Sequence, residues 1–344
     1  MRLSHQRTAV LALGAAGIGA MVAARAWHRR GAFDYAGKSV VITGGSRGLG
    51  LVLARQLADE GARLTLLARD EDELQRAASD IRQRQPFADV LTVVGDVRRR
   101  FDAERAIALA FEQYGRIDVL VNNAGIIQAG PAEHMQIADY EDAMQTHFWG
   151  PLYMTLAVLP HMRSRGEGRI VNISSIGGRI AVPHLLPYSA SKFALNGLSD
   201  GLRIELARDN IVVTTVCPGL MRTGSPVNAL FKGQRPQEYA WFAISDSLPL
   251  TSIGAERAAR QIIDACRYGD AELVITVQAK LAILARTVAP ELFSDIMTII
   301  NRLLPGPAPG GDEARPGRQI PSPLAPSVLT TLTQQAAKEN NEDR

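Results

Sequence analysis

The chain has 344 residues, enough for two average domains or for one large α/β domain with a substantial core, and we favour one domain with tails. Its 38 basic and 35 acidic residues leave a formal net charge of +3 and are spread along the chain, so the charge does not favour a nucleic-acid partner. The two cysteines, Cys217 and Cys266, lack metal-ligand spacing, and the six histidines are scattered. We interpret both cysteines as reduced core residues and expect neither a disulfide framework nor a metal site.

An apolar run lies near the N-terminus. Residues 9–24 carry no charge and are flanked by Arg7 and Arg25. The run is at the short limit for crossing a hydrocarbon core of about 30 Å. We expect a membrane anchor through residues 8–26, with the following domain in the cytoplasm, and assign residues 1–35 to the anchor and a basic linker. A cleaved signal peptide has a similar charged start and apolar middle, so it remains the alternative.

A glycine-rich turn joins the first predicted strand and helix. From Gly37 the chain reads GKSVVITGGSRGLGLVLARQLADEG, a β-branched run followed by the turn and a helix that ends at Gly61. Gly44 and Gly48 permit a tight turn and close backbone approach to a pyrophosphate, and Gly50 lets the helix pack close to the strand. The N–H groups at a helix N-terminus attract phosphate groups. The segment therefore predicts the first βα unit of a nucleotide-binding sheet.

The second predicted strand, ARLTLLARD, ends where an NAD enzyme of this fold carries an acid for the ribose hydroxyls. Ala68 stands at that place and Arg69 follows it, while Arg47 lies inside the glycine turn. Guanidinium groups suit a 2′-phosphate, so we expect NADP(H) rather than NAD. The alternative is that Arg69 and Asp70 cap a surface loop.

Strands and helices alternate through the rest of the domain. Asp96 and residues 122–125 fall at the carboxyl ends of strands, where open α/β sheets bind ligands. The alternation implies right-handed crossovers and a Rossmann-type doubly wound parallel sheet in a single α/β domain. The expected elements are a polar helix at 71–85, a strand at 90–97, a helix to Tyr114, a strand at 117–125, a helix at about 136–165 and strands at 211–219 and 271–276.

Tyr188 and Lys192 stand four residues apart in a segment with a helical pattern that follows Pro187. Such a pair shares one helix face, and a cation near a phenol favours the ionised form of the phenol. Ser175 follows the apolar run RIVNIS, which predicts a buried strand. A hydroxyl there could hold a carbonyl oxygen while Tyr188 passes it a proton. In isolation, a tyrosine and a lysine at this spacing are most often an ordinary helix pair.

Five motifs in this order closely resemble those of the classical short-chain dehydrogenase/reductase family. They are the turn TGGSRGLG (43–50), GDV (95–97), NNAG (122–125), the stretch from the serine pair to YSASK, and CPGLMRT (217–223). The resemblance covers residues 36–276. It implies an enzyme that interconverts an alcohol and a ketone or aldehyde with a nicotinamide cofactor, as a homodimer or homotetramer.

The resemblance also implies roles for single residues. Tyr188 would be the general acid or base, Ser175 would position the substrate oxygen, and Lys192 would bind the ribose and lower the pKa of Tyr188. Hydride arrival places negative charge on a carbonyl oxygen, which a hydroxyl pair can stabilise and protonate. The implied cofactor-binding residues are Thr43, Gly44, Ser46, Arg47, Gly48, Leu49, Gly50, Arg69, Asp96, Val97, Asn123, Ala124, Gly125, Tyr188, Lys192, Pro218, Gly219 and Thr223.

One position departs from the family pattern. Where the family usually carries an asparagine that holds a water between the lysine and solvent, this chain has His147 in the sequence THFWG. Imidazole can also bond a water and titrates near neutral pH, so His147 is a candidate catalytic relay. The alternative is that His147 packs and donates one hydrogen bond.

The segments after the cofactor motifs suggest an apolar substrate. Residues 219–250 would cover the substrate and are rich in apolar and aromatic side chains, although such clusters more often reflect simple packing. Together with the anchor they favour a lipophilic carbonyl or alcohol as substrate. A small or acyl-carrier substrate is one alternative, and a non-catalytic NADP-binding protein is another.

The C-terminal part divides into two segments. Residues 277–304 predict a helical extension of two apolar helices split at Pro290. These helices could rest on a membrane, complete the substrate pocket or pack against the domain or a partner subunit. Residues 305–344 contain proline, glycine and polar residues without periodicity, and we expect this tail to be disordered.

Overall fold

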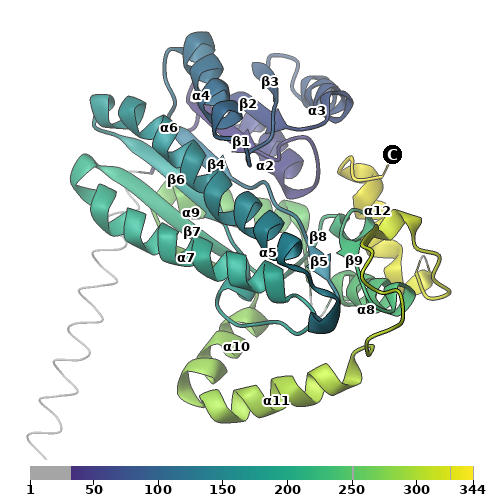
Figure 1. The fold of residues 1–344 in the computed structure, drawn as a ribbon. Coiled ribbons are helices and arrows are strands. Elements are labelled where there is room, and N and C mark those ends of the chain that lie inside the picture. The colour runs from purple at the N-terminus through teal and green to yellow at the C-terminus, as the bar shows by residue number, and fades with distance from the viewer. Residues whose placement is uncertain (1–31, 250–251, 326, 344) are drawn as a thin grey trace, which may run out of the picture. The chain divides into compact units, whose positions relative to one another are not determined.

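Seven parallel strands form the central sheet of the protein (Figure 1). The computed structural model describes residues 32–249, 252–325 and 327–343. The strands are β1 (Ser39–Thr43), β2 (Arg63–Ala68), β3 (Val90–Val94), β4 (Val119–Asn122), β6 (Gly168–Ile173), β7 (Ile211–Pro218) and β11 (Glu272–Ile275). Their order is β11-β7-β6-β4-β1-β2-β3, and every neighbouring pair is parallel. The order reverses at β1, which confirms the predicted doubly wound α/β sheet.

Helices cover both faces of this sheet (Figure 1). One face carries α4 (Arg100–Tyr114), α6 (Gly150–Arg165) and α7 (Leu186–Leu206), and the other carries α2 (Gly48–Asp59) and α9 (Ala255–Tyr268). α3 (Glu71–Arg84) lies along β2 and β3, and α5 (Ile137–Met144) packs against α7. The helix expected at about 136–165 contains a π-helical turn, η3 (Gln145–Trp149), between α5 and α6. Such turns insert one residue and change which side chains face inward.

The chain divides into two units, Met1–Asp34 and Tyr35–Arg344, and the sheet with its helices belongs to the second. The predicted anchor at residues 8–26 lies outside the described residues. In the described ranges, no helix combines the length and the apolar composition that crossing a bilayer requires.

Two apolar cores stabilise the second unit. The larger lies between the sheet and α4 and α6, where strand residues such as Val41 and Leu120 are fully buried. The smaller contains Phe231, whose ring contacts those of Tyr239 and Phe242 edge to face. These aromatic residues of the predicted lid therefore pack as a core. The cysteines are free and buried, as expected.

The segment after β7 builds a subdomain beside the sheet. α8 (Arg235–Ser247) carries two of the three core aromatic rings. A two-stranded sheet joins β8 (Leu220–Arg222) to β10 (Ser252–Gly254), and a three-stranded one joins β5 (Gln128–Ala129), β9 (Leu230–Phe231) and β12 (Arg315–Pro316). Short 3-10 turns complete it: η2 (Ala132–His134), η6 (Ser225–Val227), η7 (Gly317–Gln319) and η8 (Val328–Thr330). Two further 3-10 turns, η4 (Ile176–Gly178) and η5 (Ala207–Asp209), pack against α7 and β7 instead.

Two helices follow β11, as the sequence predicts: α10 (Val277–Val288) and α11 (Pro290–Leu303), with Pro290 at the start of the second. Both expose apolar side chains. The exposed fraction lies between 41% and 81% for Val277, Leu281, Leu284, Val288, Leu292, Ile296, Ile299, Ile300 and Leu303.

The structure differs from the expectation of a disordered tail at 305–344. His134 receives a hydrogen bond from the backbone N–H of Ala308 and pairs with Asp312, and β12 pairs with β9. The chain then ends in α12 (Thr331–Glu339), which packs against α8 and β8 (Figure 1). A sequence without periodicity can still be ordered where single residues meet specific partners. Ile320 and Ala325 do so by entering the aromatic core.

Candidate active site

Ser175, Tyr188 and Lys192 come together beyond the carboxyl end of β6. Ser175 begins η4, and its hydroxyl accepts a hydrogen bond from the N–H of Gly177 at 3.0 Å. Tyr188 and Lys192 lie in the first turns of α7. A Cβ atom at Gly178 would lie 2.7 Å from the carbonyl oxygen of Lys192, so glycine there allows η4 to approach α7. The sequence predicted this group, and the backbone contact explains why the two segments meet.

Burial controls the protonation of Tyr188. Burial raises the pKa of its phenol above the usual 10, while a hydrogen bond with Ser175 acts in the opposite direction. The predicted lowering by Lys192 is not what this structure shows. Lys192 is 4% exposed, and its ammonium lies 5.6 Å from the centre of the Tyr188 ring and donates to the carbonyl oxygen of Ile173 at 2.8 Å. Burial lowers its pKa to about 7, which weakens it as a fixed positive charge.

His147 is completely buried in the π-helical turn, edge to face with the Tyr188 ring at 5.3 Å. The N–H of Ile126 donates to His147 Nε2 at 3.1 Å, so Nδ1 carries the proton and donates to Ser191 Oγ at 2.8 Å. Burial and the nearby Lys192 hold its pKa well below 6.5. Both ring nitrogens thus have protein partners, and the geometry favours the packing alternative over a water relay.

The glycine turn has the geometry that phosphate binding requires. Gly44 has a left-handed φ of 64° and approaches the backbone of Ala124, and a Cβ at Gly50 would lie 2.0 Å from the carbonyl oxygen of Gly44. Hydrogen bonds to the residues that follow β4 hold the turn in place. The Thr43 hydroxyl accepts from the N–H groups of Asn123 and Ala124, and the Asn123 amide donates to the Thr43 and Gly44 carbonyls. The side chains of Thr43 and Asn123 therefore shape the turn rather than facing a ligand.

Other predicted cofactor residues gather along the same edge of the sheet. Gly125 lies beside the His147 ring, Val97 packs against the start of α6 at Gly150, and Thr223 is buried in the loop after β8. Leu49 lies in the first turn of α2, Pro218 ends β7 and Gly219 follows it.

Several charged residues lie around the turn, and they differ in whether they are exposed or paired. Arg69 is exposed just beyond β2. Arg47 pairs with Glu73 at 3.2 Å, and the Ser46 hydroxyl donates to the same carboxylate. Asp96 is bound by Arg98 at 2.7 Å; burial raises the pKa of this carboxyl, but the Arg98 hydrogen bonds outweigh that effect and the pKa is lowered.

Sequence reasoning missed further residues at the turn, which belong to the last part of the tail. The carbonyl oxygen of Asn340 accepts a hydrogen bond from the N–H of Gly48 at 2.9 Å, and the Asn341 amide donates to the Ser46 carbonyl at 2.9 Å. Glu342 pairs with Arg47 at 3.4 Å. No local signal in the tail marks these residues as ligands of the turn.

The turn fits a nicotinamide dinucleotide. Its N–H donor at Gly48 is used by an oxygen acceptor, and the carboxyl group of Glu342 lies next to it. Oxygen acceptors and negative charge are what a pyrophosphate would bring to a helix N-terminus. Within the described ranges, no group of three or more histidine, cysteine or carboxylate residues is arranged for a metal ion.

Three comparisons agree with this geometry. The family model for short chain dehydrogenase matches residues 38–230. The 11-beta-hydroxysteroid dehydrogenase-like 4A protein of Arabidopsis thaliana is 42% identical over 190 residues, which are 55% of this chain and 62% of that protein. The granaticin polyketide synthase putative ketoacyl reductase 1 of Streptomyces violaceoruber is 37% identical over 247 residues, 70% of this chain and 89% of that protein. The structure of a short-chain dehydrogenase from Streptomyces avermitilis superposes with a TM-score of 0.66 at 29% identity, covering 77% of this chain and 97% of that one.

Proposed function

The chain belongs to the short-chain dehydrogenase/reductase family, and from this premise we propose that it is an NADP(H)-dependent oxidoreductase that interconverts a lipophilic alcohol and its ketone or aldehyde. The observation that carries the proposal is the placement of the Ser175 and Tyr188 hydroxyls side by side, with Lys192 one helical turn further along α7. The family implies a nicotinamide cofactor, which supplies or accepts the hydride.

The residues of the chain then handle the oxygen and the proton. In the reducing direction, Ser175 and Tyr188 donate hydrogen bonds to the carbonyl oxygen, and Tyr188 transfers its proton to it as negative charge develops. The raised pKa of Tyr188 keeps the phenol protonated and suits it to act as the acid. Lys192, whose pKa lies at about 7, can return a proton to the phenolate.

The preference for NADP(H) over NAD(H) rests on two arginines. No carboxylate stands at Ala68, and Arg69 extends from the next position into solvent. Arg47 lies within the glycine turn, at the start of α2. A bidentate guanidinium binds phosphate strongly, whereas it offers little to a 2′-hydroxyl.

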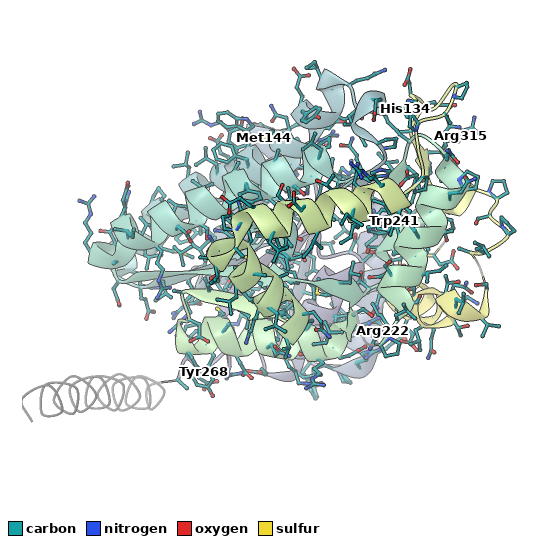
Figure 2. The ribbon with its side chains drawn as sticks, turned by 90° about the horizontal axis from the view of Figure 1, so that it is seen from below. His134, Met144, Arg222, Trp241, Tyr268 and Arg315 are labelled. Atoms are coloured by element: carbon teal, nitrogen blue, oxygen red, sulfur yellow. The ribbon has the colours of Figure 1, made fainter. Side chains whose placement is uncertain are left out.

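The surroundings of Tyr188 support a lipophilic substrate. The aromatic core of the subdomain packs directly against the Tyr188 ring, and its partly buried members include Ile127, Val182 and Trp241. Trp241 lies on α8, as labelled in Figure 2, and its indole N–H is bound to Glu238 at 2.7 Å. The side chains packed around Tyr188 are therefore largely apolar. The name of the Streptomyces violaceoruber relative, a ketoacyl reductase, favours an acyl-carrier substrate as the second candidate.

Membrane association is part of the same proposal. The run at residues 9–24 has the composition of a short anchor, and α10 and α11 expose nine large apolar side chains. Exposed apolar surface of this extent is costly in water unless a lipid surface or a protein covers it. We place the catalytic domain on the cytoplasmic side, where NADP(H) is available.

The test is oxidation of NADPH by the purified full chain with carbonyls that run from short polar ketones to steroids and long-chain aldehydes. Turnover confined to the apolar end is expected. Turnover only with acyl thioesters would replace the lipophilic substrate by the second candidate. If NADPH binds and no carbonyl is reduced, a non-catalytic role is correct and the proposal fails.

A further inference from the structure

The C-terminal segment is built to reach the cofactor turn. After α12 ends, the N–H groups of Glu342 and Asp343 both bond back to the carbonyl oxygen of Ala337. Asn341 has a left-handed φ of 58°, which asparagine adopts more readily than most residues. The chain is thereby turned so that Asn341 and Glu342 face the turn between β1 and α2.

We call residues 340–343 the hook. The helix before it, α12, packs closely against its neighbours. Ala337 is 1% exposed and lies where a side chain at Gly224 would be, because a Cβ there would come within 2.4 Å of Ala337 Cα. About one turn earlier on the same face of α12, the Thr333 hydroxyl bonds to Ser247 at 2.7 Å and to Asp246 at 3.1 Å. These are buried, specific contacts, which set a defined position for the residues that follow.

The hook occupies the hydrogen-bonding groups and the space at the turn that a phosphate would use. Asn340 accepts the N–H of Gly48 at the N-terminus of α2, and its side chain is held by the buried Arg55 at 3.1 Å. The carboxylate of Glu342 lies 2.6 Å from the place of a Cβ at Gly48, with Thr223 close by. It therefore fills the space that glycine leaves open for close approach to the turn.

The hook also engages the arginine predicted to bind the cofactor. Arg47 lies between two carboxylates, Glu73 at 3.2 Å and Glu342 at 3.4 Å, with exposed side-chain fractions of only 4% and 7%. Burial raises the pKa of Glu342, Arg47 opposes the rise, and Glu73 adds to it. Two buried carboxylates in this position disfavour a third anion, so a cofactor phosphate and Glu342 compete for the same place.

We propose that residues 340–343 are an internal competitor of the cofactor. The hook binds the glycine-rich turn in place of the phosphate groups, and the dinucleotide must displace it before the enzyme can act. This inference rests on the proposed function, because the ligand that the hook excludes is the family cofactor. Release of the hook frees the N–H of Gly48, removes one of the two carboxylates beside Arg47 and opens the approach to Thr223, so one segment controls access to this part of the turn.

The experiment measures the dissociation constant of NADPH by its fluorescence, for the full chain and for variants of the hook. Ending the chain at Lys338 removes every contact with the turn and keeps most of α12, and we expect NADPH to bind at least tenfold more tightly. Glu342→Gln keeps the whole chain and should tighten binding severalfold. The matched control is Glu339→Gln, which should leave binding unchanged within twofold. Among the described residues, the Glu339 side chain accepts a hydrogen bond from Gln335 within α12 and makes no hydrogen bond to the turn.

A second measurement follows the hook itself. Hydrogen exchange of backbone amides in residues 331–343 of the full chain should become faster when NADPH is added, because displaced amides lose their partners. Slower exchange with NADPH, or equal or weaker binding in the shortened chain and in Glu342→Gln, would overturn the inference while leaving the proposed function intact. Failure of NADPH and NADH to bind any of these proteins would overturn both.

Discussion

The two ends of the expected cofactor site are built in contrasting ways. At the catalytic end, Ser175, Tyr188 and Lys192 come from a single stretch of eighteen residues that includes η4 and the start of α7, and the local backbone brings them together. At the phosphate end, the turn after β1 meets residues nearly three hundred positions away, at Asn340 to Glu342.

The two ends differ in the sequence separation of the residues that contact each other. Contacts within a short stretch form whenever its strand and helix form, so the catalytic group is permanently assembled. Contacts between the turn and the tail close a very long loop, and they can be lost without unfolding the sheet. The phosphate end is therefore where a change in the rest of the chain can switch the site.

The largest expected effect lies at the catalytic end. Tyr188→Phe removes the proton donor and leaves the ring contacts with His147 in place, so turnover should fall by about two orders of magnitude or more while NADPH still binds. Tyr153→Phe on α6 is the matched control and should keep its activity. Steady-state kinetics with the best carbonyl decides the matter, and full activity of Tyr188→Phe would contradict the mechanism.

A smaller effect is expected at the phosphate end. Arg69→Ala should weaken NADPH binding by roughly tenfold to a hundredfold and NADH binding much less, since hydrogen bonds to charged groups contribute about 1.5–3 kcal/mol. Arg63→Ala, at the other end of the same strand, provides the control. Titration calorimetry with both cofactors measures the ratio. Equal losses for the two cofactors would place the 2′-phosphate elsewhere.

The contact between Asp246 and α12 should make the stability of the folded protein depend on pH. Burial raises the pKa of Asp246 from 3.8 to about 7, with Glu342 raising it further, while Thr333 and Arg222 oppose the shift. Between pH 4 and 7 the folded state holds a proton that the unfolded state has released, so stability falls as pH rises through this window. The Asp246→Asn side chain cannot ionise, so this variant should be more stable than the parent at pH 8. We expect a difference of about 1–2 kcal/mol, because local opening of α12 relieves part of the cost of ionising the buried carboxyl in the parent.

Urea unfolding at pH 5 and pH 8 measures this difference. The gain from Asp246→Asn should shrink at the lower pH, where the parent carboxyl is largely protonated. Asp200→Asn, at an exposed site, should show little gain at either pH. A gain of equal size at both values would show that ionisation of Asp246 is not its cause.

The smallest effect is expected at His147. Its pKa is held well below 6.5, so it stays neutral between pH 6 and 8 and contributes no inflection to the rate profile. His147→Asn should therefore change the level of activity without changing the shape of the profile in this range. An inflection near pH 6.5 that the variant loses would revive the relay hypothesis.

Local sequence determined the sheet, the glycine turn and the catalytic stretch. Each of these depends on residues close together in the chain: β-branched runs for the strands, glycine where φ is positive or backbones touch, and a four-residue spacing for a shared helix face. The order of the motifs was sufficient to identify the family, because spacing along the chain survives in the fold.

Tertiary structure alone decided the protonation of the site and the course of the tail. The pKa of Lys192 depends on how deeply α7 is buried, and the roles of the His147 nitrogens depend on Ile126 and Ser191, which no spacing rule connects to it. The tail has no periodic pattern, so its order comes from partners such as His134, Gly224 and Arg47 that lie far away in sequence. Burial and long-range contact are properties of the assembled fold, and these two properties determine which residues reach the cofactor turn.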